Sequence, residues 1–389
     1  MSPRTRLLVA LISTGLIGYI AVGSLLGRAL GDTSYGQLTV FNEVVRLVID
    51  AYVEPVNLDR AMMGARLGMA DALDGDSAYL DEEEFRLLQQ PRGEREADVG
   101  LVLTRRFSLL MVVAARPGSP AERAGLRTGD VIKAIDGRHS RLLASSAGER
   151  LLRGAAGSAV RLSILRVGED PFEVSVAREL IQPLPPQRRM LDGGTGYLRV
   201  AEFPPGVAEE VRSQVEALRQ SGARSLVLDL RGAAWGDPAA GVGVAELFMK
   251  GGPVAKIAGR RVEERTFEAD PARASWTGPV AVLIDTGTAG PAEVVASALL
   301  DSERGPLVGE HTFGRAAVQK AVPLPEGGLW LTVARFVSPK GTVIHGQGLE
   351  PTVPASRAKG EEGEPSPPDA DPVLDKALEV LRGQADKAA

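Results

Sequence analysis

Two short apolar runs, each followed by a glycine-containing turn and a helical pattern, constrain the fold of this chain most. They are Leu226–Leu230 and Val280–Ile284. Runs of this length without polar alternation are typical of strands buried on both faces. Because such strands alternate with helices, residues 185–355 are predicted to form an α/β domain with a parallel or mixed sheet. Ligands bind at the carboxyl ends of such strands, which here are residues 229–236 (DLRGAAWG) and 285–293 (DTGTAGPAE).

Composition excludes several classes of function. The 389 residues carry a net charge of −5, so the charge balance gives no basis for a nucleic-acid partner. The chain has no cysteine, which excludes disulfides, thiol nucleophiles and thiolate metal sites. Its three histidines, His139, His311 and His345, are scattered and do not favour a zinc site. We therefore expect no metal or other cofactor.

An uncharged stretch, Leu7–Leu26, follows two arginines near the amino terminus. A helix of 20 residues, at about 1.5 Å each, spans the ~30 Å hydrocarbon layer of a membrane. The arginines favour an internal amino terminus with the remainder exported. We expect residues 1–31 to be a signal anchor in the inner membrane, with the bulk of the protein in the periplasm or otherwise outside the cytoplasm. A cleaved signal peptide is the alternative, because residues 29–31 (ALG) form a passable cleavage site.

Residues 35–95 are predicted to be a helical region. Apolar residues at three- and four-residue steps indicate an amphipathic helix there: Leu38, Phe41, Val45, Val48 and Tyr52. Asn57 is placed to cap a second helix, and Asp81 with Glu84 forms a capping-box pattern for a third. A polar stretch at 90–96 then marks a domain boundary.

Residues 96–182 change to short strand patterns, at Leu109–Ala114, Val160–Leu165 and Phe172–Val176. A brief helix is predicted with Ser119 as its cap, Pro120 in its first turn and Gly125 at its end. Three motifs carry a family signature: 99–102 (VGLV), 118–126 (GSPAERAGL) and 128–137 (TGDVIKAIDG). With these motifs the segment resembles a PDZ domain of the bacterial protease-associated kind.

This resemblance implies that a peptide carboxyl terminus is bound as an added strand. The backbone amides of Val99, Gly100, Leu101 and Val102 are then expected to hold the carboxylate. Glycine at position 100 lets the backbone turn its N–H groups toward an anion. The alternative is that these residues are only strand and turn, in a groove that the protein itself occludes.

Further motifs outside this segment agree on one family: 73–81 (LDGDSAYLD), 227–231 (VLDLR), 308–319 (VGEHTFGRAAVQ), 332–341 (TVARFVSPKG) and 346–351 (GQGLEP). With them the chain from about residue 38 to 382 resembles the C-terminal processing peptidases, the tail-specific serine peptidases. The resemblance implies a mixed α/β protease-like core with an inserted PDZ domain. After the core, residues 356–371 are charged and proline-rich, as in a loose linker. Pro372–Arg382 is predicted to be a short closing helix within the tail, 372–389.

The family cleaves with a Ser/Lys dyad whose lysine is oriented by a glutamine. Gly287 and Glu293 match the ends of the family's nucleophile motif, which places the nucleophile at Gly290. The lysine follows 25 positions later, at Arg315, and the glutamine position is retained as Gln319. The resemblance therefore assigns both dyad positions to substituted residues.

Elementary chemistry makes these substitutions disabling. Glycine has no side-chain oxygen to form an acyl-enzyme, and an arginine keeps its proton at any ordinary pH and cannot act as the base. Pro291 has no N–H to give to an oxyanion. The other oxyanion loop carries Trp235 before Gly236, where the family has glycine.

Two alternatives for catalysis remain open. Thr288 carries a hydroxyl and Lys320 an amine near the dyad positions, although both are displaced from them. A Ser/His/Asp arrangement lacks a Gly-x-Ser-x-Gly motif and a serine partner for His311. We expect His311 and His345 at the surface or at strand ends, and Trp235 and Phe313 in core packing.

The sequence thus predicts a membrane-anchored, exported pseudoprotease that binds polypeptide carboxyl termini or unfolded segments, as an adaptor or regulator. An active serine endopeptidase with a rearranged site, acting on envelope proteins, is the second hypothesis. A structural partner of an active homologous peptidase is the third.

Overall fold

The computed structural model describes residues 36–90, 96–106, 108–356 and 370–388. The predicted signal anchor, residues 1–31, lies outside the described residues, as do most of the predicted linker, 356–371, and most of the polar boundary, 90–96. No helix in the described part of the chain is long and apolar enough to cross a membrane. The contacts of the chain divide it into two units, residues 1–66 and 67–389.

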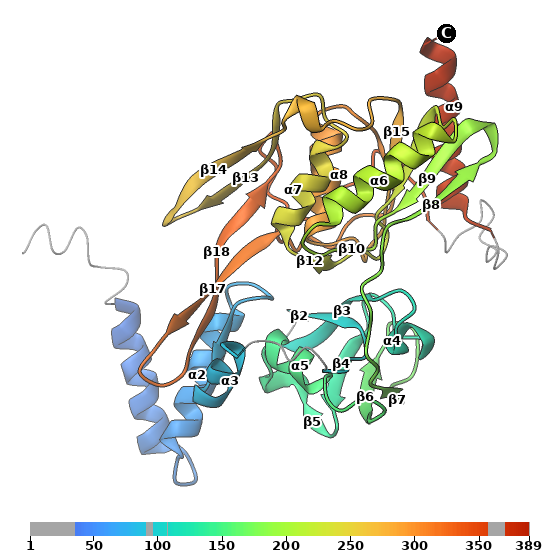
Figure 1. Ribbon diagram of the computed structural model, residues 1–389. Coiled ribbons are helices and arrows are strands. Elements are labelled where there is room, and N and C mark those ends of the chain that lie inside the picture. The colour runs from blue at the N-terminus through green and yellow to red at the C-terminus, as the bar shows by residue number, and fades with distance from the viewer. Residues whose placement is uncertain (1–35, 91–95, 107, 357–369, 389) are drawn as a thin grey trace, which may run out of the picture. The chain divides into compact units, whose positions relative to one another are not determined.

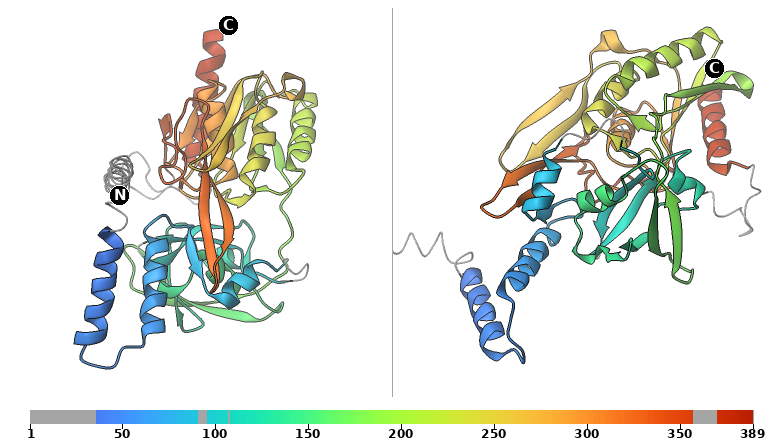
Figure 2. Two further views of the ribbon diagram at one scale, coloured as in Figure 1. Left: turned by 90° about the vertical axis from the view of Figure 1, so that its left-hand side faces the viewer. Right: turned by 60° about the horizontal axis from the view of Figure 1, so that its bottom comes forward.

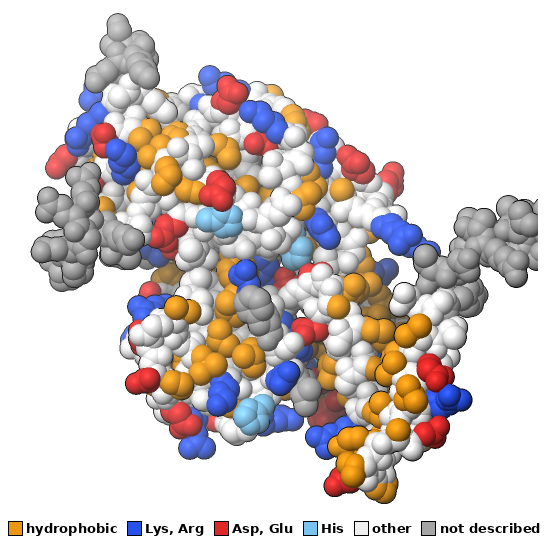
Figure 3. Space-filling view, turned by 180° about the vertical axis from the view of Figure 1, so that it is seen from behind, with side chains coloured by type: hydrophobic (Ala, Val, Ile, Leu, Met, Phe, Trp, Pro, Cys, Tyr) orange, Lys and Arg blue, Asp and Glu red, His pale blue; other side chains and the backbone are white. Residues whose placement is uncertain are grey.

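The first unit contains a helix over residues 36–51 and the beginning of α2 (Leu58–Asp71). Asn57 caps α2 as predicted, because its Oδ1 accepts a hydrogen bond from the Arg60 amide at 2.9 Å. The predicted amphipathic helix is confirmed in position, yet much of its apolar stripe stays exposed, for example 57% at Leu38 and 62% at Tyr52. Figure 3 shows hydrophobic side chains gathered over these helices.

The core of the second unit is a six-stranded sheet in the order β19-β16-β15-β11-β9-β8. Figure 1 labels β8, β9 and β15 of this sheet. Its strands are β8 (Gln187–Leu191), β9 (Thr195–Arg199), β11 (Ser225–Asp229), β15 (Val280–Ile284), β16 (Leu307–Gly309) and β19 (Val353–Pro354). Only β8 and β9 pair antiparallel among the pairs of this sheet. The two apolar runs predicted from the sequence are confirmed as neighbouring parallel strands, fully buried along β15.

Helices cover both faces of this sheet. On one face lie α6 (Val207–Gln220), α7 (Pro238–Glu246) and α8 (Pro291–Asp301), and on the other lies α9 (Pro372–Ala388). Because side chains alternate along β11, Leu226 and Leu228 pack toward the first group while Val227 packs toward α9. The predicted closing helix was too short, since the helix continues past Gly383, which keeps a helical, negative φ.

A second sheet has the order β1-β18-β13-β14, with β17 pairing with β18. Its strands are β1 (Ala78–Leu80), β13 (Pro253–Gly259), β14 (Val262–Glu268), β17 (Ala317–Pro323) and β18 (Gly328–Val337), and Figure 2 shows the long hairpin of β17 and β18. β10 (Glu202–Phe203) and β12 (Trp235–Gly236) form a separate short parallel pair. The segment 73–81 enters this sheet through β1. Asp81 and Glu84 make the predicted capping box at the start of α3 (Glu82–Leu88).

Residues 96–182, called the inserted domain below, contain an antiparallel sheet in the order β2-β3-β4-β6-β7, with β5 beside β4. The elements are β2 (Leu101–Arg106), β3 (Leu109–Ala115), α4 (Pro120–Arg123), β4 (Val131–Ile135), β5 (Arg138–His139), α5 (Ser145–Leu151), β6 (Ala159–Leu165) and β7 (Phe172–Ala177). The described residues also include short 3₁₀ turns at Ser140–Leu142 in this domain and at Asp192–Gly194 and Pro271–Arg273 outside it. The three predicted strands are confirmed, and Ser119 caps α4 by accepting from the Glu122 amide at 3.2 Å.

Candidate functional site

Two loops at the carboxyl ends of β11 and β15 form the centre of the candidate site. The second loop ends at Gly290, which directly precedes α8 and has φ 58° and ψ −114°. This backbone conformation is strained for any residue with a Cβ. A Cβ built on Gly290 would lie 3.3 Å from the carbonyl oxygen of Arg315. The two positions that the sequence assigned to the dyad are therefore adjacent in the fold.

Glu293, in the first turn of α8, holds these two segments together. Its carboxylate is fully buried and accepts from the amides of Gly290 at 2.9 Å and Arg315 at 2.8 Å. It also accepts from the Gly314 amide at 2.6 Å and the Thr312 hydroxyl at 2.5 Å. Burial raises the pKa of Glu293, and these hydrogen bonds oppose the rise. Sequence reasoning used Glu293 only to align a motif and missed this organising role.

The side chain of Arg315 pairs with Asp76. Its Nε lies 2.9 Å from Oδ1 and 3.1 Å from Oδ2 of Asp76, whose side chain is only 3% exposed. Burial by itself would lower the pKa of Arg315, but the carboxylates of Asp76 and Glu149 raise it above its usual value. A guanidinium in this setting cannot accept a proton from a nucleophile.

Gln319 does not contact the residue that it was expected to orient. It lies on β17, and its Nε2 donates a long hydrogen bond of 3.5 Å to the hydroxyl of Thr332 on β18. Between Gly290, Arg315 and Gln319 the structure thus brings the first two positions together through their backbones. Among the described residues, no hydrogen bond joins the side chains of Arg315 and Gln319, which have different partners.

The loop after β11 is fixed by short hydrogen bonds to the loop after β15. The Gly232 amide donates to Asp285 at 2.9 Å, and the Ala289 amide donates to the carbonyl of Ala233 at 2.9 Å. Gly236 has φ 118°, and a Cβ there would lie 2.2 Å from the Phe203 carbonyl oxygen, so no other residue fits. Pro291 is buried at the first position of α8 and offers no N–H.

Trp235 and Phe313 pack as expected, against a small cluster that joins the inserted domain to the two loops. The cluster consists of Val102, Val113, Ala114, Ala234 and Ala289. Three of its members come from β2 and β3, so these strands cover the loops beside Gly290. A polypeptide approaching the dyad positions from this direction must displace the packing.

The two residues considered as substitute catalytic groups are poorly placed. Thr288 is fully buried, and its hydroxyl accepts from the Asp285 amide and lies 3.0 Å from the carbonyl oxygen of Leu230, to which it donates. Lys320 is exposed on β17. The Thr288 hydroxyl is committed to fixing the loop, which leaves it unsuited to attack a substrate.

His311 is 43% exposed, as expected, with Nε2 3.8 Å from Glu350. His345 departs from the prediction, because it is 9% exposed and its Nδ1 is buried without a hydrogen-bond partner. Burial lowers the pKa of His345, so the neutral form is favoured. It lines a cavity of about 940 Å³ together with Asp76 and Arg315. The sequence around His345 gave no signal that this side chain would be buried.

The loop predicted to hold a peptide carboxylate already holds one from its own chain. The amides of Val99 and Gly100 both donate to Oδ1 of Asp98, at 2.6 and 3.1 Å. Gly100 has φ 84°, and a Cβ there would lie 2.4 Å from Cβ of Ser119. The side chains of Val99, Leu101 and Val102 are buried. The amides of this loop are thus engaged by the side chain of the preceding residue, and carboxylate binding by the loop stays a prediction.

The neighbouring edge of β2 is also occupied. The Leu103 amide donates to Oε1 of Glu149 at 3.2 Å, and the Arg105 amide donates to the carbonyl of Gly75 at 2.9 Å. Glu149 lies on α5, and burial raises its pKa although Arg315 opposes the rise. An added strand would have to replace both groups. The sequence offered no signal for these contacts, which join segments far apart in the chain.

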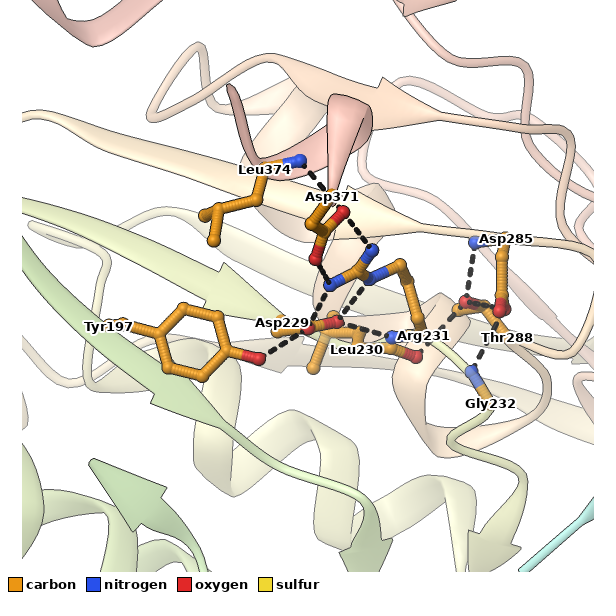
Figure 4. Close-up of polar contacts among 9 residues, drawn as sticks. All are labelled: Tyr197, Asp229, Leu230, Arg231, Gly232, Asp285, Thr288, Asp371 and Leu374. Atoms are coloured by element: carbon orange, nitrogen blue, oxygen red, sulfur yellow. Dashed lines mark hydrogen bonds and ion pairs between the residues drawn. The ribbon is translucent and has the colours of Figure 1, made fainter. Parts of the chain in front are cut away.

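An ionic network holds the end of β11, where the first loop of the candidate site begins (Figure 4). Arg231 donates to Asp229 at 2.7 Å and to both oxygens of Asp371 at 2.8 Å, which ties the start of α9 to the end of β11. Tyr197 donates to Asp229 at 2.6 Å, and burial beside that carboxylate raises the pKa of Tyr197 to about 12. Although burial alone would raise it, Arg231 brings the pKa of Asp229 below its usual value.

Comparison with known proteins gives matches to two family models. The model of peptidase family S41 matches residues 194–355, and a model of the PDZ domain matches residues 111–166. The first covers both loops of the candidate site. The second lies within the inserted domain.

Individual proteins are similar over most of their length. A carboxyl-terminal-processing protease of Synechocystis sp. is 33% identical over 312 residues, which cover 78% of this chain and 73% of that protein. The carboxy-terminal processing protease CtpA of Bacillus subtilis is 28% identical over 353 residues, covering 90% and 76%. The solved structure of a photosystem II D1 C-terminal processing protease superposes with a TM-score of 0.69 at 29% identity, covering 82% of this chain and 92% of that one.

Proposed function

This chain belongs to the carboxyl-terminal processing proteases of peptidase family S41, and we propose that it binds polypeptide carboxyl termini without cleaving them. The observation that carries the proposal is the pair of positions 290 and 315. At the first there is no side-chain oxygen, and at the second a permanently charged guanidinium is engaged with Asp76. Neither a nucleophile nor a base is present where the family uses them.

The surroundings support the loss of hydrolysis. The residue after Gly290 is Pro291, which gives no donor to an oxyanion. Trp235 packs in the cluster between the loops and the inserted domain, where the family pattern has glycine. A serine at position 290 alone would not restore hydrolysis, because the base at 315 and the amide at 291 would still be missing. The groups of a catalytic set act as a unit.

The inserted domain supports the binding half of the proposal. Its loop at 99–102 has two amides directed at a carboxylate, and β2 has an edge suited to an added strand. In the state described here Asp98, Glu149 and Gly75 take the positions of the ligand. A bound peptide would therefore replace hydrogen bonds within the chain by equivalent hydrogen bonds to the peptide. Because the internal bonds must first break, the affinity is lower than the new contacts alone would give.

The setting we propose is the cell envelope, with residues 7–26 as an inner-membrane anchor and the remainder outside the cytoplasm. The support is the uncharged stretch and the arginines that precede it. Affinity without turnover suits an adaptor or regulator that presents polypeptides to an active peptidase or withholds them from it.

The test uses the full chain, purified in detergent, and a labelled peptide that ends in apolar residues with a free carboxylate. Fluorescence anisotropy is expected to show saturable binding, which the same peptide with an amidated end lacks. Mass spectrometry of the mixture is expected to show intact peptide after long incubation. Cleavage that disappears in Thr288→Ala or Lys320→Ala would establish the rearranged serine-type endopeptidase instead.

One observation favours a second candidate, a structural partner of an active homologous peptidase. The helix at 36–51 and α2 expose several large apolar side chains: Leu38, Val40, Val44, Leu47, Val48, Ile49, Tyr52, Leu58 and Met69. Apolar patches of this kind mark association surfaces. Co-purification of an active peptidase with the wild-type chain, lost in Leu47→Glu, would support this role.

A further inference from the structure

A chamber of about 710 Å³ lies at the carboxyl ends of β9, β11 and β15, on the side of the core that carries α9. Five arginines line it: Arg127, Arg188, Arg189, Arg199 and Arg231. Such a concentration of guanidinium groups contrasts with the net charge of −5 of the chain. The volume falls within the range of about 300–1,000 Å³ that is typical of ligand sites. None of residues 290, 315 and 319 lines this chamber.

The acidic residues of the chamber are already engaged. Each accepts a hydrogen bond from the chain itself: Glu122 from Gly118, Asp285 from Gly232 and Gly287, Glu310 from Ser356, and Asp371 from Arg231. Amides and a hydroxyl supply no compensating charge, so among these four carboxylates only that of Asp371 is paired with a cation, Arg231, within the described residues. A further wall of the chamber carries arginines of β8 and β9.

That wall, formed by β8 and β9, carries cations without carboxylate partners. Two arginines of the chamber lie outside this wall and are paired with carboxylates. Arg127 pairs with Glu169, and Arg231 pairs with Asp229 and Asp371. Among the described residues, no carboxylate pairs with the other three arginines. The guanidinium of Arg188 contacts Gln214, and that of Arg189 lies 4.5 Å from the centre of the Tyr197 ring. The side chain of Arg199 makes no hydrogen bond or ion pair in the described part of the chain, and its charge acts on the nearby carboxylate of Asp229.

The inserted domain contributes apolar residues to the lining of the chamber. They are Ala114, Ala115, Pro117 and Leu126, which stand beside Glu122, Arg127 and Thr128. A ligand that fits both kinds of lining has anionic groups as well as methylene or methyl groups. Glutamate-rich polypeptide has this character, because each side chain ends in a carboxylate on an apolar stem.

We propose that this chamber binds an acidic segment of polypeptide through Arg189 and Arg199, separately from any carboxyl terminus. The inference rests on the proposed function for the polypeptide nature of the ligand, and it narrows the ligands to chains with clustered glutamate or aspartate. Carboxylates prefer guanidinium partners because both planar groups form two parallel hydrogen bonds.

The experiment measures anisotropy of a labelled peptide with four successive glutamates and an amidated end, and of its four-glutamine counterpart. We expect the full chain to prefer the glutamate peptide by about ten-fold or more, since hydrogen bonds between charged groups are stronger than those between neutral groups. The preference is expected to shrink at high salt. Equal affinities for the two peptides overturn the proposal, as does equal competition by inorganic tripolyphosphate at the same charge concentration.

Variants locate the site. Arg189→Gln with Arg199→Gln should abolish the preference, and Arg189→Lys with Arg199→Lys should retain most of it. The matched control is Arg260→Gln with Arg261→Gln, which removes the same charge from two exposed residues between β13 and β14 and should leave the preference intact. An equal loss in the control, with all melting temperatures unchanged, overturns the assignment to this chamber.

The apolar-tailed peptide with a free carboxylate distinguishes this inference from the proposed function. It should bind Arg189→Gln with Arg199→Gln as well as it binds the wild type. If the apolar-tailed peptide binds neither the wild type nor any variant while the preference for the glutamate peptide persists, the proposed function is refuted and the proposal for the chamber stands. Binding of the tail without any glutamate preference removes the chamber alone.

Discussion

The loops around Glu293 and the outer edge of β2 both direct backbone amides at a carboxylate, yet they are held in opposite ways. At the loops the carboxylate is fully buried and serves four donors at once. At β2 the acceptors are separate groups, and Asp98 keeps 18% of its side chain exposed. A ligand can therefore replace the contacts at β2 one at a time. The loops, in contrast, can open only if the four hydrogen bonds to Glu293 are lost together. The comparison shows exchangeable contacts at β2 and a single shared, buried acceptor at the loops.

The largest effect is expected for Glu293→Ala. It leaves three amides and a hydroxyl without their acceptor, and each unsatisfied buried group costs at least about 1 kcal/mol. We expect the free energy of unfolding in urea to fall by about 4 kcal/mol. Glu293→Gln keeps the shape but sets an NH₂ group against amide donors, so its cost should lie between those of alanine and wild type.

The control for this prediction is Glu210→Ala, at an exposed position in the first turn of α6. Substitutions of this kind usually change the free energy of unfolding by less than about 0.5 kcal/mol. Should Glu293→Ala prove no more harmful than this control, the loops do not depend on the buried carboxylate, and the contrast with β2 disappears.

Arg315→Ala tests the ion pair that replaced the catalytic base. Removing the cation leaves Asp76 buried without its partner, and breaking a buried pair in this way costs about 3 kcal/mol. Adding Asp76→Asn should recover part of the loss, because the neutral amide no longer needs a cation. A double-mutant cycle from urea unfolding measures this coupling. Strict additivity of the two substitutions would show that the pair is not what holds Asp76.

Gly290→Ser separates backbone strain from chemistry. The position has φ 58° and ψ −114°, a region that costs a residue with a side chain about 2 kcal/mol. We expect unfolding in urea to register this cost, and peptide cleavage to stay undetectable because Arg315 cannot take the proton. Gly193→Ser, at φ 74° and ψ 11°, is the matched control and should cost about 1 kcal/mol. Hydrolysis by the serine variant would mean that another base serves the site.

The comparison also separates what sequence could predict from what it could not. Caps at Asn57, Asp81 and Ser119 and the strands β11 and β15 follow local rules, and the structure contains them. The pair of Arg315 with Asp76 joins residues 239 positions apart, and no periodicity encodes such a contact. The burial of His345 likewise depends on how the β2 region packs over the loops. Family motifs assign the dyad to positions 290 and 315, but only the fold reveals that the side chain of Arg315 pairs with Asp76.

The smallest effect is expected for Asp98→Ala, and it bears most directly on β2. Without the carboxylate, the amides of Val99 and Gly100 lose an internal acceptor that competes with the ligand. We expect the free apolar-tailed peptide to bind about ten-fold more tightly, which corresponds to about 1.4 kcal/mol. The amidated peptide should gain nothing, and Asp170→Ala, at an exposed position, should bind as the wild type does. Unchanged affinity in Asp98→Ala would mean that these amides are not where a terminal carboxylate is held, and that the edge of β2 is as closed to ligands as the loops around Glu293.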